Sequence, residues 1–201
     1  MSSVADAVAA IRTGGLVVLP TDTVYGLACS PYREGPVRTL SELKGRRPAQ
    51  PIALLAASVD ELLDCVPELR GQSAVIARAL LPGPYTLVLP NPARRFPWLA
   101  GDRPDAIGVR VPALAGVARD LLDAVGALAA TSANLHGGPD PRQLEDVPAE
   151  LLLDAAVLDG GELPGTPSTV LDLTGAEPRV LREGAVAAVD ALARVEVARR
   201  E

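Results

Sequence analysis

The sequence predicts a single α/β domain with a mixed sheet. Short runs of Val, Leu and Ala have the character of buried strands, and amphipathic segments that can form helices alternate with them. Neither an internal repeat nor a linker interrupts the 201 residues, which are enough to bury a core as one domain over 1–201. Because aromatic residues make up only 2% of the chain, Ala, Leu and Val must fill that core.

The stretch 16–27 is the one around which the rest is organised. Its apolar start, 16–20, predicts a strand buried on both faces, and Pro20 closes this strand because its ring removes a donor from the ladder. A helix over 3–13 precedes it, with Ser3 as N-cap.

The remaining elements follow from the same patterns. Further helices are predicted over 36–45, 58–65, 72–81, 114–125 and 143–152, with a helical tail from Ala187 on the surface. Further strands are predicted over 52–55, 85–89, 107–111, 128–131, 155–158, 169–173 and 180–182. Residues 21–25 are predicted as a turn, and 90–105 and 133–141 as loops.

Composition excludes several classes of function. No apolar run is long enough to cross a bilayer and no signal peptide is evident, so a cytoplasmic protein is expected. His136 is the only histidine, which argues against a histidine metal site or a Ser-His-Asp triad, and no metal ligands are predicted. Cys29 and Cys65 lack metal-ligand spacing and are expected to be buried, reduced thiols.

The net charge excludes fewer classes of function than the composition does. A net charge of −6 argues against a non-specific nucleic-acid binder but leaves room for a local basic pocket. Neither a Walker A motif nor a Gly-rich dinucleotide loop is present, so any phosphate must be held by cationic and hydroxyl side chains.

Polar side chains gather at four predicted strand or helix ends. They are the turn Thr21–Tyr25, the run Lys44–Arg47, the run Thr131–Asn134, and Ser168-Thr169 with Arg182 on the neighbouring strand. Each group also has a purely structural interpretation, as a turn, a helix cap or a cation at a helix C-terminus. Three cations within four residues of an acidic protein nevertheless favour an anionic ligand.

Arg110 is a candidate anion-binding residue for a different reason. It lies in an otherwise apolar strand, and a buried arginine must reach water or an anion. The alternative is an edge strand that faces solvent.

Several ordered motifs carry a resemblance to a known family. They are LPTDTVYGL at 19–27, LKGR at 43–46, LPGPYTLVLP at 81–90, IGVRVP at 107–112, ATSAN at 130–134, and STVLDLTG with VLREGAV at 168–175 and 180–186. In these motifs, from about Gly14 to Gly184, the chain resembles the YrdC family of threonylcarbamoyl-AMP synthases.

The resemblance implies a twisted mixed sheet with flanking helices around a concave, positively charged cavity. It implies a nucleotidyltransferase that makes threonylcarbamoyl-AMP and pyrophosphate from L-threonine, bicarbonate or carbon dioxide, and ATP. Mg²⁺ is expected to accompany the ATP. The product is expected to pass to the proteins that complete threonylcarbamoyl-adenosine in tRNA.

The resemblance also assigns roles by position. Lys44 and Arg46 are expected to act on the reacting anions as catalytic residues. The threonine-binding set is Thr23, Arg110 and Ser168, and the nucleotide-binding set is Arg46, Gln50, Ser132, Asn134 and Arg182. The chain departs from the family pattern at two positions. Many relatives have proline directly after the Lys-x-Arg motif, whereas here Arg47 stands between that motif and Pro48. Gln50 occupies a position that is often Asn or another polar residue in relatives.

Other functions stay open at this point. A YciO-like homologue would share the fold with a different or weak nucleotide activity, and Tyr85 in the third motif is compatible with that branch. A double-stranded RNA-binding module could use the same concave surface, although the acidic charge and the scarcity of aromatics argue against it. A carbamoyl-transfer domain of a hydrogenase-maturation protein is disfavoured because such a domain belongs to a longer chain.

Overall fold

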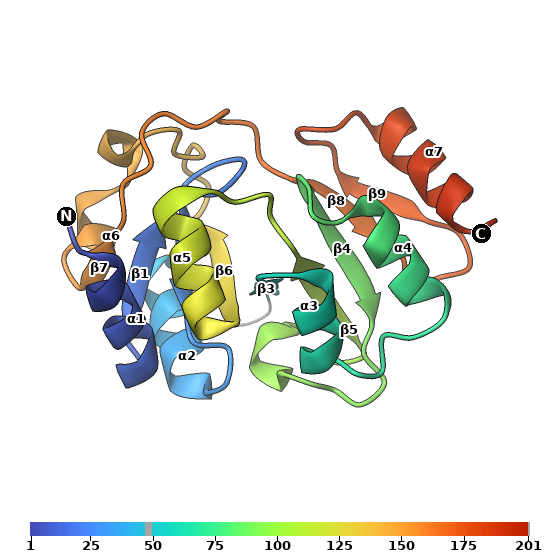
Figure 1. Ribbon diagram of the computed structural model, residues 1–201, viewed down its shortest axis with the longest axis horizontal. Coiled ribbons are helices and arrows are strands. Elements are labelled where there is room, and N and C mark those ends of the chain that lie inside the picture. Colours follow the sequence, from blue (N-terminus) through green and yellow to red (C-terminus); the bar gives the residue numbers. More distant parts are fainter. Residues whose placement is uncertain (47–49, 201) are drawn as a thin grey trace.

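A computed structural model describes residues 1–46 and 50–200, and these residues form one mixed sheet flanked by helices (Figure 1). Over this part of the chain nine strands are hydrogen-bonded in the order β7-β1-β2-β6-β3-β5-β4-β8-β9. The strands are β1 (Leu16–Leu19), β2 (Gly26–Cys29), β3 (Ala53–Ala56), β4 (Tyr85–Pro90), β5 (Ala106–Arg110), β6 (Ala127–Ser132), β7 (Ala155–Val157), β8 (Thr169–Asp172) and β9 (Arg179–Arg182).

Helices precede, connect and follow these strands along the chain. They are α1 (Val4–Thr13), α2 (Glu34–Leu43), α3 (Val59–Cys65), α4 (Gln72–Leu80), α5 (Gly116–Val125), α6 (Ala149–Leu152) and α7 (Ala188–Ala198), with 3₁₀ turns η1 (Pro97–Leu99) and η2 (Leu144–Asp146). The first begins as predicted, because Ser3 and Asp6 form a reciprocal capping box, and it ends at Gly14 with a φ of +91°.

The prediction of a mixed sheet is confirmed. The pairs β1–β7, β3–β5 and β4–β8 are parallel. The pairs β1–β2, β2–β6, β3–β6, β4–β5 and β8–β9 are antiparallel. β1 is buried along its whole length, as its apolar run predicts.

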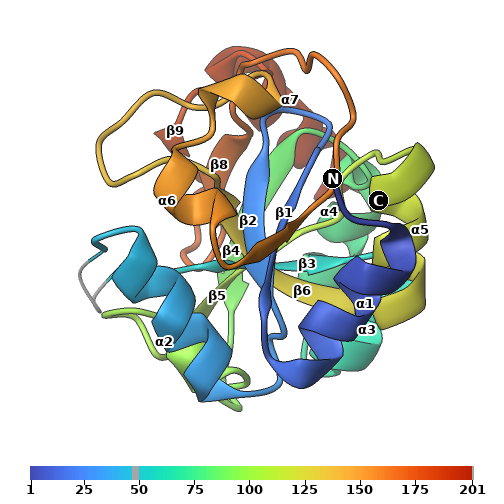
Figure 2. The same cartoon turned by 90° about the vertical axis from the view of Figure 1, so that its left-hand side faces the viewer.

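Helices cover the two faces of the sheet unequally. On one face, α1 and α5 pack over β1, β2 and β6 through residues such as Ile11, Leu121 and Leu122. On the other face, α2, α3, α4 and α7 enclose the larger core. Figure 2 shows α1 and α2 on opposite sides of β1 and β2. The face carrying α1 and α5 continues past β6 toward β9, and that continuation positions the site described below.

Three sequence-based predictions are corrected. β2 was missed because Gly26 and Ala28 are weak strand formers; pairing with both β1 and β6 makes this segment a fully buried strand. The single helix predicted over 143–152 is instead η2 and α6, separated by Val147 and Pro148. Cys29 is a buried free thiol as expected, but Cys65 is only half-buried.

Within residues 1–46 and 50–200, no helix combines the length and the apolar character needed to span a bilayer.

Candidate active site

A cavity of about 310 Å³ opens over the central strands on the face shared with α1 and α5. Its floor comes from small or short side chains on neighbouring strands, among them Ala53 on β3, Thr86 on β4 and Ala130 on β6. Because these residues are too small to fill the space above the sheet, a hollow remains there. The polar side chains that line it are Thr21, Arg46, Thr86, Arg110, Thr131, Ser132, Asp140, Ser168 and Arg182.

Lys44 lies at the end of α2 and is almost fully buried. Its Nζ donates to the Ser132 carbonyl and, at 2.9 Å, to Asn134 Oδ1. The Asn134 amide is itself fixed, because its Nδ2 donates to Gly138 O at 2.7 Å and its Oδ1 accepts from Ser132 Oγ at 2.7 Å. Lys44 therefore reaches across to the end of β6 and binds the Ser-x-Asn motif.

The pKa of Lys44 is lowered to about 7, mainly by burial and also by the nearby charge of Arg46, while the charge of Asp140 opposes the shift. A charge state balanced at neutral pH is typical of residues at functional sites. Lys44 is also the only lysine among the 19 cationic residues of the chain.

Arg46 lines the cavity beside Lys44. Its two terminal nitrogens donate to Thr131 Oγ1 and to Pro51 O, both at 2.8 Å, while its Nε is buried without a hydrogen-bond partner. Burial lowers the pKa of its guanidinium. Arg47, the third cation of this run, and Pro48 lie outside the described residues.

Gln50 does not belong to the cavity lining, although its side-chain oxygen is buried without a partner. Its expected contact with the nucleotide stays a prediction.

Arg110 is buried at the end of β5 and points toward the turn that follows β1. Its Nη2 forms an ion pair with Asp22 and donates to Thr23 Oγ1 at 2.8 Å. Asp22 in turn accepts from the backbone N–H of Ala113 at 3.0 Å. Burial lowers the pKa of Arg110, and the charge of Asp22 opposes that change. Arg110 does not face solvent on an edge strand, because β5 lies between β3 and β4.

Ser168 and Arg182 meet at the far side of the cavity, where β8 and β9 are neighbours. Arg182 donates to the Ser168 carbonyl at 2.9 and 3.1 Å and to Ser168 Oγ at 3.2 Å. Ser168 Oγ also contacts Thr86 Oγ1 at 2.8 Å. Gly184 passes so close behind them that a Cβ there would lie 2.6 Å from the Ser168 carbonyl carbon.

The predicted site residues therefore converge from four parts of the chain. Arg46, Arg110, Ser132, Ser168 and Arg182 line the cavity directly. Thr23 contacts Arg110, and Lys44 and Asn134 contact Ser132, so these three lie immediately behind the lining.

Tyr25 departs from the polar turn to which it was assigned. It is fully buried, and its hydroxyl contacts Asp159 Oδ1 at 2.8 Å and Gly161 O at 2.9 Å and accepts from the Gly160 N–H. Tyr25 therefore anchors the loop after β7 and does not line the cavity.

Sequence reasoning did not assign a role to two carboxylates of this site. Asp22 was included in the polar turn 21–25 but not as the partner of Arg110, although a buried arginine requires an anionic partner. Asp140 lines the cavity from the loop after β6, and no local pattern marked it. Among the described residues no three His, Cys, Asp or Glu side chains come together as a metal site.

Comparison with known proteins decides the family. The Sua5/YciO/YrdC family model, described as telomere recombination, matches residues 9–184. The chain belongs to this family. Members with related sequences include a putative threonylcarbamoyl-AMP synthase of Mycobacterium tuberculosis, 38% identical over 91% of this chain and 84% of the relative.

Solved structures of the Sua5/YciO/YrdC family agree with the fold. Pyrococcus abyssi Sua5 complexed with L-threonine superimposes with a TM-score of 0.82 at 36% identity, covering 91% of this chain and 54% of that one. Escherichia coli YciO gives a TM-score of 0.80 at 28% identity, covering 94% of this chain and 92% of that one. The chain thus spans about half of the Sua5 chain and nearly all of YciO.

Proposed function

We propose that this chain is a threonylcarbamoyl-AMP synthase, which makes threonylcarbamoyl-AMP and pyrophosphate from L-threonine, bicarbonate and ATP. The observation that carries the proposal is the convergence of Arg46, Arg110 and Arg182 on one cavity, with Lys44 directly behind it. The relatives named threonylcarbamoyl-AMP synthase support it, as does the threonine complex of the Sua5 relative.

The chemistry explains why so many cations are needed. The threonine amine adds to carbon dioxide and loses a proton to give a carbamate, whose oxygen then attacks the α-phosphorus of ATP and displaces pyrophosphate. A carboxylate, a carbamate and a triphosphate must therefore lie close together. Each like-charge pair repels by about 1 kcal/mol in water and by several times more in a cleft. Fixed cations offset this repulsion, so catalysis is chiefly positioning and charge stabilisation.

The chemistry of the side chains and the family resemblance suggest which residues bind each substrate. Thr23, Arg110 and Ser168 present hydroxyl groups and a guanidinium suited to the threonine carboxylate and hydroxyl. Ser132, Asn134 and Arg182, with Gln50 outside the lining, are proposed to hold the nucleotide. Lys44 and Arg46 are proposed to act on the carbamate and the α-phosphate between them.

Mg²⁺ is proposed to enter with ATP. This ion keeps several waters and uses one or two carboxylates together with substrate phosphates. Asp140 is the one carboxylate in the described lining, so the donor set suits an ion held mainly by the nucleotide. When bound, Mg²⁺ would neutralise phosphate charge.

The proposal treats residues 1–201 as a single domain and extends to location and partners. We place the enzyme in the cytoplasm because ATP and tRNA are available there. The adenylate would pass to proteins that transfer the threonylcarbamoyl group to tRNA, since a mixed anhydride is short-lived in water.

The deciding experiment incubates the protein with ATP, bicarbonate, Mg²⁺ and one amino acid at a time, with mass detection of the adenylate. We expect threonylcarbamoyl-AMP with threonine and little product with serine. Absence of adenylate with every amino acid would reject the proposal.

The structural likeness to Escherichia coli YciO, with a TM-score of 0.80, supports one second candidate, a YciO-like activity on nucleotides without adenylate synthesis. Nucleotide binding without product would support that candidate. RNA binding can be tested separately by filter binding over a salt series, where a steep loss of affinity with salt indicates phosphate contacts.

A further inference from the structure

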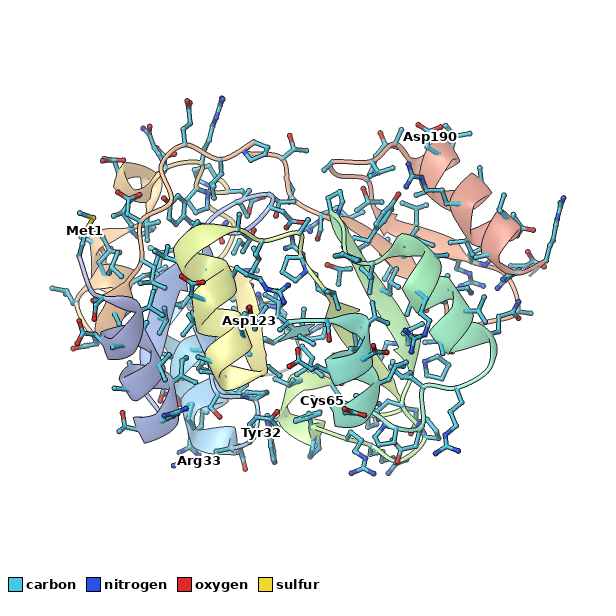
Figure 3. The ribbon with its side chains drawn as sticks, viewed as in Figure 1. Met1, Tyr32, Arg33, Cys65, Asp123 and Asp190 are labelled. Atoms are coloured by element: carbon cyan, nitrogen blue, oxygen red, sulfur yellow. The ribbon has the colours of Figure 1, made fainter. Side chains whose placement is uncertain are left out.

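A second hollow, of about 560 Å³, lies away from the site described above, between α3, the segment that enters η1, and the loop from β2 to α2. Figure 3 places two of its residues, Tyr32 and Cys65, together at the lower edge of the molecule. The residues that line it are Tyr32, Glu61, Asp64, Cys65, Arg95, Phe96, Trp98 and Gly126. The two hollows have no lining residue in common.

The hollow contains an unusual share of the aromatic side chains. The whole chain has three Tyr, one Phe and one Trp. Tyr25 and Tyr85 are buried in the core, and the other three all line this hollow. The rings of Tyr32 and Phe96 are 5.8 Å apart and tilted by 55°. Phe96 and Trp98 pack in part against the core, but neither is fully buried, and together with the exposed Tyr32 they bring three of the five aromatic side chains of the protein into one surface hollow.

The aromatic side chains are held in place by the backbone around them. Phe96 has a φ of +50°, a conformation that is costly for a residue with a bulky side chain. The fully buried Asn91 fixes the preceding loop, since its Oδ1 accepts from Arg95 N and its Nδ2 donates to Arg95 O, both at 2.9 Å. Trp98 Nε1 donates to Pro31 O at 2.8 Å, which orients the indole.

The charges in the hollow are predominantly negative. Glu61 and Asp64 lie on α3 and form no ion pair in the described part of the chain. The one cation of the lining, Arg95, is already engaged by Glu68 through contacts of 2.8 and 3.2 Å. The pKa of Tyr32 is raised to about 12, mainly by burial, with smaller contributions from Cys65 and from the charge of Glu61. The negative charge of Glu61 therefore acts on the Tyr32 hydroxyl.

We propose that this hollow binds an organic ammonium cation of the linear alkyl diamine or polyamine class. Carboxylates attract the ammonium groups, the ring faces of Tyr32, Phe96 and Trp98 add cation–π attraction, and the methylene chain packs against the same rings. The volume lies within the range of small-molecule sites. An anion is disfavoured here, because Arg95 is neutralised and the other two charged groups are carboxylates.

The single tryptophan makes the proposal directly testable. Trp98 is the only Trp of the chain, so its fluorescence reports on this hollow alone. The full-length protein is titrated, without ATP or threonine, with hexamethylenediamine and with spermidine. Hexamethylene glycol, which has the same carbon chain without charge, and Mg²⁺ at equal charge concentration are the reference titrants. We expect saturable changes with the amines and none with either reference.

Variants locate the binding. Glu61→Gln with Asp64→Asn is expected to weaken diamine binding at least about tenfold, and Phe96→Leu about threefold, as loss of charge attraction and of one cation–π contact requires. The matched control, Glu150→Gln with Asp154→Asn, removes two exposed carboxylates in and after α6, beside the edge strand β7 and outside the lining of the hollow, and should leave the affinity unchanged. Circular dichroism establishes that each variant is folded.

Several results would overturn the proposal: no saturable response to either amine, an equal response to the glycol or to Mg²⁺, or unchanged affinity in both the carboxylate double variant and Phe96→Leu. Because no substrate is present, these outcomes do not depend on the synthase activity.

Discussion

The two hollows of this protein differ in how their charges are held. In the cavity over the sheet, Lys44 and Arg110 are buried and hydrogen-bonded to Asn134, Asp22 and Thr23. In the aromatic hollow, Glu61 is half-buried and Asp64 is exposed. Charges of the first kind are fixed before any ligand arrives, which suits catalysis by preorganised electrostatics. Charges of the second kind attract a ligand and remain solvated.

The difference comes from the elements that build each hollow. Small side chains on β3, β4 and β6 leave room above the sheet. Arg110 and Arg182 reach this space from strand ends, and Lys44 and Arg46 from the end of α2. The aromatic hollow is built instead by loops and by the outer surface of α3. Variants at the two places should therefore have effects of different size and kind.

The largest effect is expected where Lys44 or Arg46, the two cations proposed to act on the reacting anions, is removed. Lys44→Ala or Arg46→Ala should abolish adenylate formation, by about a thousandfold or more, because charge stabilisation of the reacting anions is lost. Pyrophosphate release and adenylate mass are the measurements, with circular dichroism to show that the fold is intact.

The control for these two variants is Arg38→Ala. Arg38 is an exposed residue of α2, and its ion pair with Glu42 lies at the surface. Its activity should match that of the wild type. Wild-type pyrophosphate release by Lys44→Ala or Arg46→Ala would remove that residue from the catalytic set.

The free energy of unfolding should depend more on the buried ion pair than on the exposed ones. Asp22→Asn leaves the Arg110 guanidinium buried without its counter-charge, and we expect the free energy of unfolding to fall by about 3 kcal/mol. Threonine should stabilise this variant more than the wild type, because its carboxylate can replace the lost charge. Thermal unfolding with and without threonine measures both effects.

Asp60→Asn is the matched control, since its pair with Arg78 is exposed and should change stability by less than about 1 kcal/mol. An equal loss of unfolding free energy in the two variants would show that the buried pair Asp22–Arg110 contributes no more to stability than the exposed pair Asp60–Arg78.

A smaller change should follow from crowding the wall of the cavity. Gly184→Ala places a methyl group against the Ser168 carbonyl, and we expect a loss of about 1–3 kcal/mol in stability together with a higher KM for threonine. Gly35→Ala, in α2 with nothing near its Cβ position, should be neutral or slightly stabilising. An unchanged KM for threonine in Gly184→Ala would show that the part of the cavity around Ser168 does not bind threonine.

The smallest effect is a pH dependence specific to the cavity. Above the pKa of Lys44, about 7, the enzyme loses the positive charge that attracts phosphate, so kcat/KM for ATP should fall by up to about tenfold per pH unit. Lys44→Arg should flatten this fall.

The same pKa predicts a stability slope. Because the folded pKa lies below the ordinary value of 10.5, the unfolded chain binds more protons between about pH 7 and 10.5, and the free energy of unfolding should rise with pH in that window. NMR of the single lysine, labelled with carbon-13, measures the pKa directly. A lysine that titrates near 10.5 would contradict both expectations.

Much of this molecule could be predicted from its sequence because local patterns and tertiary packing agree. The apolar run of β1, the Ser3 cap and the alternation of β5 all describe elements that form where expected. β2 could not be found this way, since Gly26 and Ala28 form a strand only because β1 and β6 lie on either side. Strand pairing is a non-local property that a window of residues does not contain.

The candidate site shows the same limit. The family motifs marked Lys44, Ser132 and Arg182 because these residues lie within contiguous patterns. Asp140 enters the cavity from a loop without a pattern of its own, and the orientation of Tyr25 away from the cavity depends on the distant segment 159–161. Both the place of Asp140 in the cavity and the orientation of Tyr25 depend on tertiary contacts that local sequence patterns do not contain.

Having one lysine has a practical consequence. Reagents that acylate amines can modify this chain at only two places, the N-terminal amine and Lys44. Because Lys44 is buried directly behind the cavity lining, a reagent must reach Nζ through the cavity, and a bound substrate should lower the extent of acylation there. Ordinary labelling chemistry followed by mass spectrometry can read occupancy of this one pocket without any engineered reporter.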